Sequence, residues 1–224
     1  MNNFNLMAIG AIASCFSAIP AVAATTVYAD RGSFASNVGA SVTDDYSNRN
    51  YRFIQSDSAM SAVLGQTKYK TTGFTDLNIV FPLGSNGPIY CAGCNGSFTL
   101  GFESTSLSRN GGIFGVALDV VFNSRSLPYG ALVTFGDNST TLFTLPISSG
   151  FFGLSSSKGI KSIDFGPSGG TTRAGDFGID NLTIAASTAV PEPSTWIMML
   201  LGFGLIGSAL RASKRRQKIS VSYA

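Results

Sequence analysis

Short runs of alternating apolar residues, each ended by a turn sequence, recur about every 10 to 15 residues between Leu77 and Ile184. Alternation with a period of two is the pattern of a strand that buries one face. Gly, Pro, Asn and Asp between the runs end each strand. We therefore expect a mainly β fold, with a single antiparallel β-sandwich, jelly-roll-like, because many short strands with frequent turns are typical of that architecture.

The expected strands are the segments 77–81, 98–102, 113–122, 131–135, 151–152, 160–165 and 177–184. Gly136-Asp137-Asn138 predicts a hairpin turn after the segment 131–135, with Leu142 on the return strand. In the last segment the apolar face changes at Asp180-Asn181, which predicts a β-bulge or a bend there. One short helix is expected over residues 32–38, begun by Asp30, and no other helical periodicity is visible before the C-terminal end. The 17 phenylalanines are expected to fill the core.

The chain contains no histidine among its 224 residues. This excludes Ser-His and Cys-His catalysis and His-ligated zinc sites. The net charge of +3 does not describe the central part of the chain, because the C-terminal tail holds five of the 15 Lys and Arg residues. Residues 24–189 hold ten Lys and Arg against eleven Asp and Glu. The basic balance therefore gives no support for a nucleic-acid partner.

The N-terminal end has the pattern of an export signal. Residues 6–22 are apolar, and Ala21-Val22-Ala23 predicts cleavage by signal peptidase between Ala23 and Ala24. The segment before the apolar run has no Lys or Arg, which departs from the usual pattern. Cys15 also fits a lipoprotein acylation site, but it lies inside the apolar run and ahead of the Ala-Val-Ala site. We therefore expect a signal peptide over residues 1–23 and a β-sandwich passenger domain over residues 24–187.

The C-terminal end combines two prolines, an apolar stretch and a basic stop. Residues 188–195 form a Pro-containing linker and motif, residues 196–212 are expected to be a transmembrane helix, and residues 213–224 a basic cytoplasmic tail. The uncharged run covers about 15 residues, whereas about 20 span a bilayer core, so the span would be thin. The residues of the basic stop are Arg211, Lys214, Arg215 and Arg216. The alternative is a core helix with a solvated basic end.

The motif residues are Pro191, Glu192, Pro193, Trp196, Met198, Met199, Gly202, Phe203, Gly204 and Gly207, followed by the basic stop. This pattern resembles the PEP-CTERM sorting signal of Gram-negative bacteria in its Pro-Glu-Pro-x-x-Trp form. Ile197 departs from the Ala that often follows the Trp, and the chain continues beyond Arg216, where such signals often end sooner. The resemblance implies an inner-membrane precursor, and an exosortase-type membrane transpeptidase that cuts near the Pro-Glu-Pro element. It further implies a final place in the envelope or outside the cell, commonly in bacteria that make exopolysaccharide.

The passenger also resembles, more loosely, a recurrent secreted domain of PEP-CTERM proteins. The matching pieces are residues 90–98, 135–137, 151–153 and 177–182. This resemblance implies a sandwich without an assigned biochemical activity, and no catalytic residue follows from it.

Cys91 and Cys94 are the one Cys-x-x-Cys of the chain. In an exported protein they are expected to form a disulfide that closes a tight turn at Ala92-Gly93. A redox-active site would need a helix N-terminus, but a strand follows. Haem attachment would need His where Asn95 stands, and a zinc site would need further ligands.

Asp137, Asp176 and Asp180 lie in oxygen-rich loops beside predicted strands. Carboxylates and carbonyls of such loops can hold calcium. Asp and Asn also bond to their own backbone in turns, and we favour this turn chemistry over a metal site. No cofactor is therefore expected, with calcium as the alternative.

The most economical hypothesis is an exported, non-enzymatic envelope protein associated with exopolysaccharide or biofilm. Tyr51, Tyr69, Tyr90 and Tyr129 are candidates for sugar contacts, although each could equally be structural. The first alternative is a carbohydrate-active hydrolase, an enzyme that would use two paired carboxylates. The available carboxylates are Glu103, Asp119, Asp164 and Asp176. A purely structural matrix protein without a ligand is the second alternative.

Overall fold

A computed structural model describes residues 24–82, 87–94, 97–108, 111–123, 129–167, 177–188 and 193–216. The strands are β1 (Thr25–Tyr28), β2 (Ser41–Asp44), β3 (Ile54–Gln55), β4 (Lys68–Thr71), β5 (Asn78–Pro82), β6 (Pro88–Ala92), β7 (Phe98–Gly101), β8 (Ile113–Asn123), β9 (Tyr129–Phe135), β10 (Thr140–Thr144), β11 (Gly150–Pro167) and β12 (Phe177–Ala185). The helices are α1 (Arg31–Ser36), α2 (Asp57–Ala62) and α3 (Pro193–Arg216). The predicted mainly β class is confirmed.

The twelve strands belong to one curled antiparallel sheet, whose main path runs β10-β9-β11-β8-β12-β6-β5-β3. β1 pairs with β11, β2 pairs with β12, and β4 joins the sheet through β7. Because the strands are joined in one sheet, the jelly-roll-like sandwich stays a prediction. The signal helix expected over residues 1–23 lies outside the described residues.

The long strand β11 keeps the sheet continuous, because its two parts pair with different strands. Its first part, from Gly150 to Ser155, pairs with β8, while its second part, from Ile160 to Pro167, pairs with β9. Gly159 between them has a φ of 75°, a backbone conformation that favours glycine, and the register shifts just after it. The sequence predicted two separate strands here, whereas one bent strand carries the chain around the curl.

The core lies inside the curl and is dominated by aromatic rings. Phe98 is fully buried, and its ring centroid lies 5.0 Å from Tyr90, 4.9 Å from Phe165 and 5.7 Å from Phe177. Aromatic pairs at such separations add to the gain from burying their area. The expectation that phenylalanines form the core is therefore confirmed for the centre of the domain.

Several local predictions also hold. Asp30 caps α1, because its Oδ1 accepts a hydrogen bond of 2.8 Å from Ser33 N. The hairpin joins β9 to β10, with Asn138 at a φ of 63° in the turn. The bulge in β12 lies where the apolar face changes: the register with β8 shifts between Asp180 and Thr183, and Asn181 has a φ of 50°.

Two local predictions are wrong. The six-residue helix α2 was missed, although Ser56 caps it by accepting a hydrogen bond from Ala59 N. A helix this short has too few residues to show a 3.6-residue period. The face of β5 that alternation marks is only half-buried, while Asn78 and Val80 on the other face are buried. A polar residue at a buried position broke the apolar pattern on which the prediction depended.

Candidate functional site

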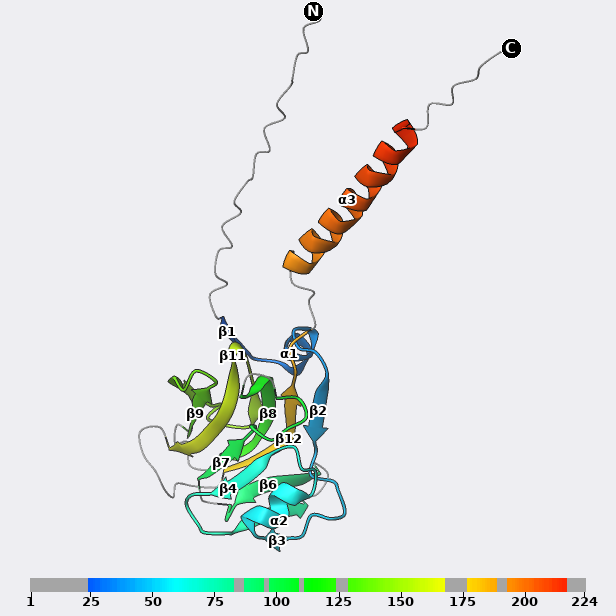
Figure 1. The fold of residues 1–224 in the computed structure, drawn as a ribbon. Helices are drawn as coiled ribbons and strands as arrows, with labels where there is room; N and C mark the ends of the chain where they lie inside the picture. Colours follow the sequence, from blue (N-terminus) through cyan, green and yellow to red (C-terminus); the bar gives the residue numbers. More distant parts are fainter. Residues whose placement is uncertain are drawn as a thin grey trace, which may run out of the picture.

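The predicted sorting tail coincides with α3. Pro193 is the first residue of this helix, and its bounds include Trp196 and the four basic-stop residues. Pro191 and Glu192 lie outside the described residues. The large apolar side chains from Ile197 to Leu210 are all exposed, by 44% to 70%. Figure 1 shows α3 standing apart from the sheet. The alternative of a buried core helix is therefore wrong.

None of the helices, as far as the structure describes them, combines the length and the apolar character needed to cross a membrane. The transmembrane helix over residues 196–212 accordingly stays a prediction. The predicted signal-peptidase site is described only on one side, since Ala24 is the first described residue and Ala23 is not described.

Both ends of the domain leave it at the same pole (Figure 1). Ser157 N donates a hydrogen bond of 3.2 Å to Ala24 O at the start of the domain. At its end, Gly39 N donates to Ala186 O at 2.8 Å. Helix α2 and strand β3 lie at the opposite, distal pole. The predicted signal peptide and sorting tail would therefore hold the same pole of the domain toward a membrane.

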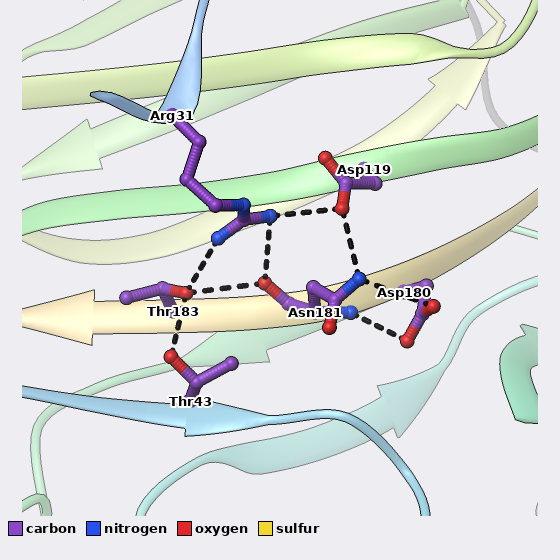
Figure 2. A network of polar contacts seen from close by, with 6 residues as sticks. All are labelled: Arg31, Thr43, Asp119, Asp180, Asn181 and Thr183. Atoms are coloured by element: carbon purple, nitrogen blue, oxygen red, sulfur yellow. Dashed lines mark hydrogen bonds and ion pairs between the residues drawn. The ribbon is translucent and has the colours of Figure 1, made fainter. Parts of the chain in front are cut away.

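A polar network ties the N-terminal helix to the sheet (Figure 2). Arg31, at the start of α1, forms an ion pair of 2.9 Å with Asp119 Oδ2 on β8. The same guanidinium donates to Thr183 Oγ1 at 2.9 Å and to the carbonyl oxygen of Asn181 at 3.3 Å. Asn181 Nδ2 also donates to Asp119 Oδ2 at 2.9 Å. Because the bulge in β12 turns Asn181 toward Asp119, one arginine can join α1, β8 and β12.

Asp180 stands next to this network, and burial is the main reason that its pKa is raised, with the nearby Asp119 charge adding to the effect. Asp119 and Asp180 are register partners on β8 and β12. Two adjacent carboxylates could suggest acid–base chemistry, but Oδ2 of Asp119 already accepts hydrogen bonds from Arg31 and Asn181. The network accounts for Asp119 as a structural residue.

The other carboxylates considered for a hydrolase are also engaged with neighbours. Glu103 pairs with Lys161 at 3.5 Å, and Asp164 accepts a hydrogen bond from Thr99 Oγ1. Asp176 lies outside the described residues. These contacts of the described carboxylates give no support to the hydrolase alternative, which stays a prediction.

The described calcium candidates likewise have other partners. Asp137 is held in its turn by Lys158, at 2.8 Å, and by Ser139 N, at 3.0 Å. The hydrogen bond from Lys158, followed by those from Ser139, lowers the pKa of Asp137. Within the described ranges, no three or more His, Cys, Asp or Glu residues lie together so as to hold a metal ion. Turn chemistry therefore explains Asp137, while Asp176 is not described and Asp180 belongs beside the Arg31 network.

Cys91 and Cys94 form a disulfide, as predicted. Gly93 lies inside this loop with a φ of 60°, and a Cβ added to it would come within 2.7 Å of Phe74 Cδ2. Glycine is therefore required there for two reasons, the left-handed backbone and the close approach of the phenylalanine ring.

The sequence did not reveal a buried carboxylate that sits among tyrosines. Asp44, at the end of β2, accepts hydrogen bonds from the hydroxyls of Tyr51 and Tyr69 and from Tyr46 N. Burial is the largest effect on Asp44 and raises its pKa. Tyr46 and Tyr51 are close to Asp44 in sequence, but Tyr69 comes 25 residues later and reaches it only in the folded chain.

The same burial corrects the predicted sugar contacts. Tyr69, Tyr90 and Tyr129 are buried in the core, where a polysaccharide could not reach their rings. Tyr51 is half-buried and donates its hydroxyl to Asp44. Burial raises the pKa of Tyr51, Tyr69 and Tyr90, as expected for phenols that stay protonated inside a protein.

Comparison with known proteins identifies the C-terminal end. Residues 189–216 match the family model of the PEP-CTERM protein-sorting motif. No curated protein matches the chain, and no solved structure matches it. The matched residues are those that the sequence marked as the motif, the apolar stretch and the basic stop. The chain therefore carries a PEP-CTERM protein-sorting motif, which marks it as an exported protein that an exosortase sorts through a membrane-anchored precursor.

Proposed function

We propose that the protein is a non-enzymatic β domain that the exosortase system delivers to the cell envelope or to the extracellular polysaccharide. The sorting motif at residues 189–216 is the observation that carries this proposal. The exposed apolar side chains of α3 support it, because an exposed apolar surface of this kind is typical of a membrane or protein contact. Calcium is not required for this role.

The arrangement of the two ends supports the same route. The signal peptide and the sorting tail would both be attached at one pole of the domain (Figure 1). Two cleavages would then release the domain from both segments. Signal peptidase would act between Ala23 and Ala24, and the exosortase near Pro191 to Pro193. The finished domain would then begin with β1 and end shortly after β12.

Intact mass spectrometry of envelope and medium fractions from the native host tests the proposal. We expect a mature chain that begins at Ala24, ends near Pro191 to Pro193, and is lighter by two hydrogen atoms because of the disulfide. A Pro193→Ala variant should accumulate uncut at the membrane. Pro146→Ala, which removes a proline from the domain instead, should be processed normally. A full-length chain ending at Ala224 in the wild-type envelope would overturn the processing step.

The proposed lack of catalysis has its own test. The mature protein would be incubated with a panel of polysaccharides while new reducing ends are measured. We expect no release above the background of a heat-denatured sample. Release that disappears in Asp164→Ala or Glu103→Ala would instead establish a hydrolase.

A further inference from the structure

One edge of the sheet is exposed and carries no charge. The main path of the sheet ends in β10, which pairs with β9 and with no other described strand. Its sequence, Thr-Thr-Leu-Phe-Thr, contains no charged residue and no proline. Soluble proteins usually protect an edge strand with such residues or cover it with another segment. The edge of β10 is therefore a candidate for pairing with another chain.

Strand β4 shows what a protected edge looks like in the same domain. It pairs with β7 alone, and Lys68 and Lys70 are exposed on it. Helix α2 also covers its backbone, because Tyr69 N donates to Ser61 Oγ at 2.9 Å and Ser61 Oγ donates to Tyr69 O at 3.4 Å. In the described part of the chain, β10 has neither protection, and four of its five residues are exposed.

The backbone of β10 presents every second residue to the open side. Just beyond the strand, Leu145 N donates to Tyr129 O at 2.9 Å. Hydrogen bonds to one neighbour recur at every second residue of an antiparallel strand, so Phe143 and Thr141 also bond to β9. The residues whose N–H and C=O groups point away from β9 are therefore Thr140, Leu142 and Thr144.

The side chains at this edge are apolar on both faces of the sheet. On the outer face, Leu142 is 51% exposed and lies opposite Leu132 of β9, which is 39% exposed. On the inner face, Phe143 is half-buried, and its ring centroid lies 6.3 Å from that of Phe152 in the core. A strand added to β10 would cover the leucines and the open side of Phe143, which favours its addition.

No charge stands in the way of such a strand. All register partners of β10 on β9 are uncharged. In the turn before β10, Asp137 is paired with Lys158 at 2.8 Å. Asp164 lies on β11, beyond Leu132, and accepts a hydrogen bond from Thr99 Oγ1. Like charges directly opposite each other weaken strand pairing, and this edge has none to oppose.

We propose that two copies of this protein pair edge to edge through β10, antiparallel and about a two-fold axis at Leu142. Leu142 would face Leu142 of the second copy, and Thr140 would face Thr144. In this register every outward N–H and C=O group of β10 meets a partner, and the exposed leucines of both copies lie side by side. The strand is thus complementary to itself, which makes a second copy its partner. Because both copies use the same strand, the contact closes as a dimer.

The two copies would point in opposite directions. In the turn before β10, Gly136 N donates to Gly159 O at 3.0 Å, while Ser157 N donates to Ala24 O at 3.2 Å. The turn therefore lies near the pole where both chain ends emerge, and antiparallel pairing reverses this pole in the second copy. Tails in one membrane would instead point both copies the same way. The dimer is thus expected of the released domain, and in this respect the inference rests on the proposed function.

Analytical ultracentrifugation of the mature protein from the medium, over a range of concentrations, tests the pairing. An edge of five residues is small for an interface, so we expect a monomer–dimer equilibrium with Kd on the order of micromolar. Leu142→Lys would place like charges opposite each other at the two-fold axis and should raise Kd roughly tenfold or more. Leu142→Glu should act in the same way. An equal mixture of the two variants should recover the dimer, because Lys would then face Glu.

Val27→Lys is the matched control. Val27 is 55% exposed on β1, which pairs with β11 alone among the described strands. This variant should dimerise like the wild type. All three variants should melt like the wild type, because both positions are exposed. Loss of the dimer in Val27→Lys but not in Leu142→Lys would assign the contact to β1 and overturn the proposal.

The other outcomes are equally decisive. A protein that stays monomeric up to about 1 mM, or that grows into larger assemblies, would overturn the dimer. A mixture of the Lys and Glu variants that stays monomeric would refute the register at Leu142. If the host yields only full-length chain, the proposed processing fails, and the same measurements on that chain in detergent still decide the pairing.

Discussion

Replacing Gly93 by alanine should destabilise the domain for two separable reasons. The backbone at Gly93 has a φ of 60°, where a Cβ costs about 1–2 kcal/mol. The new Cβ would also lie 2.7 Å from Phe74 Cδ2 and 3.3 Å from Leu77 Cδ2. Relieving such overlap typically costs about 1–3 kcal/mol. The expected total loss of unfolding free energy is therefore about 2–5 kcal/mol.

Gly65 offers a matched control for the first of these costs. Its φ is 66°, almost the same as that of Gly93, but an added Cβ there would meet nothing within 4 Å. Gly65→Ala should thus lose only about 1–2 kcal/mol. The difference between the two variants isolates the contact between the disulfide loop and Phe74.

Thermal unfolding followed by circular dichroism measures both variants under the same oxidising conditions. For a domain of this size, each kcal/mol lowers Tm by roughly 2–4 °C. Gly93→Ala should accordingly melt roughly 2–12 °C below Gly65→Ala. Equal melting temperatures would refute the reasoning, because they would mean that the Phe74 ring moves aside without cost. A Gly93→Ala, Phe74→Leu double variant should recover part of the loss if the ring is the obstacle.

Two further predictions concern the buried and half-buried carboxylates. Burial raises the pKa of Asp44 in the folded state above its ordinary value of 3.8, so the unfolded chain loses this proton at lower pH than the folded chain. The unfolding free energy of the wild type should therefore fall, relative to that of Asp44→Asn, as pH rises from 3.8 through the folded pKa of Asp44. Urea unfolding of both proteins across this range measures the difference. Parallel pH profiles of the two proteins would contradict the prediction. For the Arg31–Asp119 pair, whose side chains are 39% and 34% exposed, a double-mutant cycle with Arg31→Gln and Asp119→Asn should give a coupling of only about 0.5–1 kcal/mol. A coupling near zero in urea unfolding would show that the pair does not fasten α1 to the sheet.

Predictions from the sequence succeeded where the signal was local. Alternation of apolar residues correctly placed the buried face of β9, because Ala131, Val133 and Phe135 are buried. The change of face at Asp180-Asn181 located the bulge in β12, since a single extra residue reverses the side chains that follow. The Cys-x-x-Cys spacing and the sorting motif also needed no knowledge of distant contacts.

Predictions failed where a position depended on partners far along the chain. Asn78 is buried because its Nδ2 donates to Asp57 Oδ1 at 2.8 Å and its Oδ1 accepts from the Tyr90 hydroxyl at 2.8 Å. A satisfied polar group can occupy the core, but the sequence does not show where its partners will be. For Tyr69, Tyr90 and Tyr129 the sequence left sugar contact and a structural role open, and only their burial in the fold favours the structural role.

The amino-acid sequence was enough to predict that this protein carries a sorting motif and that its domain is mainly β. A sorting motif is recognised as a linear segment, and the side chains of a strand alternate every two residues. Both signals therefore depend only on residues that are close in sequence. That the strands join in one curled sheet, that Tyr69 reaches the buried Asp44, and that Asn78 is buried between Asp57 and Tyr90 could be learned only from the fold. These features depend on contacts between residues distant in sequence, whose energies exist only once the chain has folded.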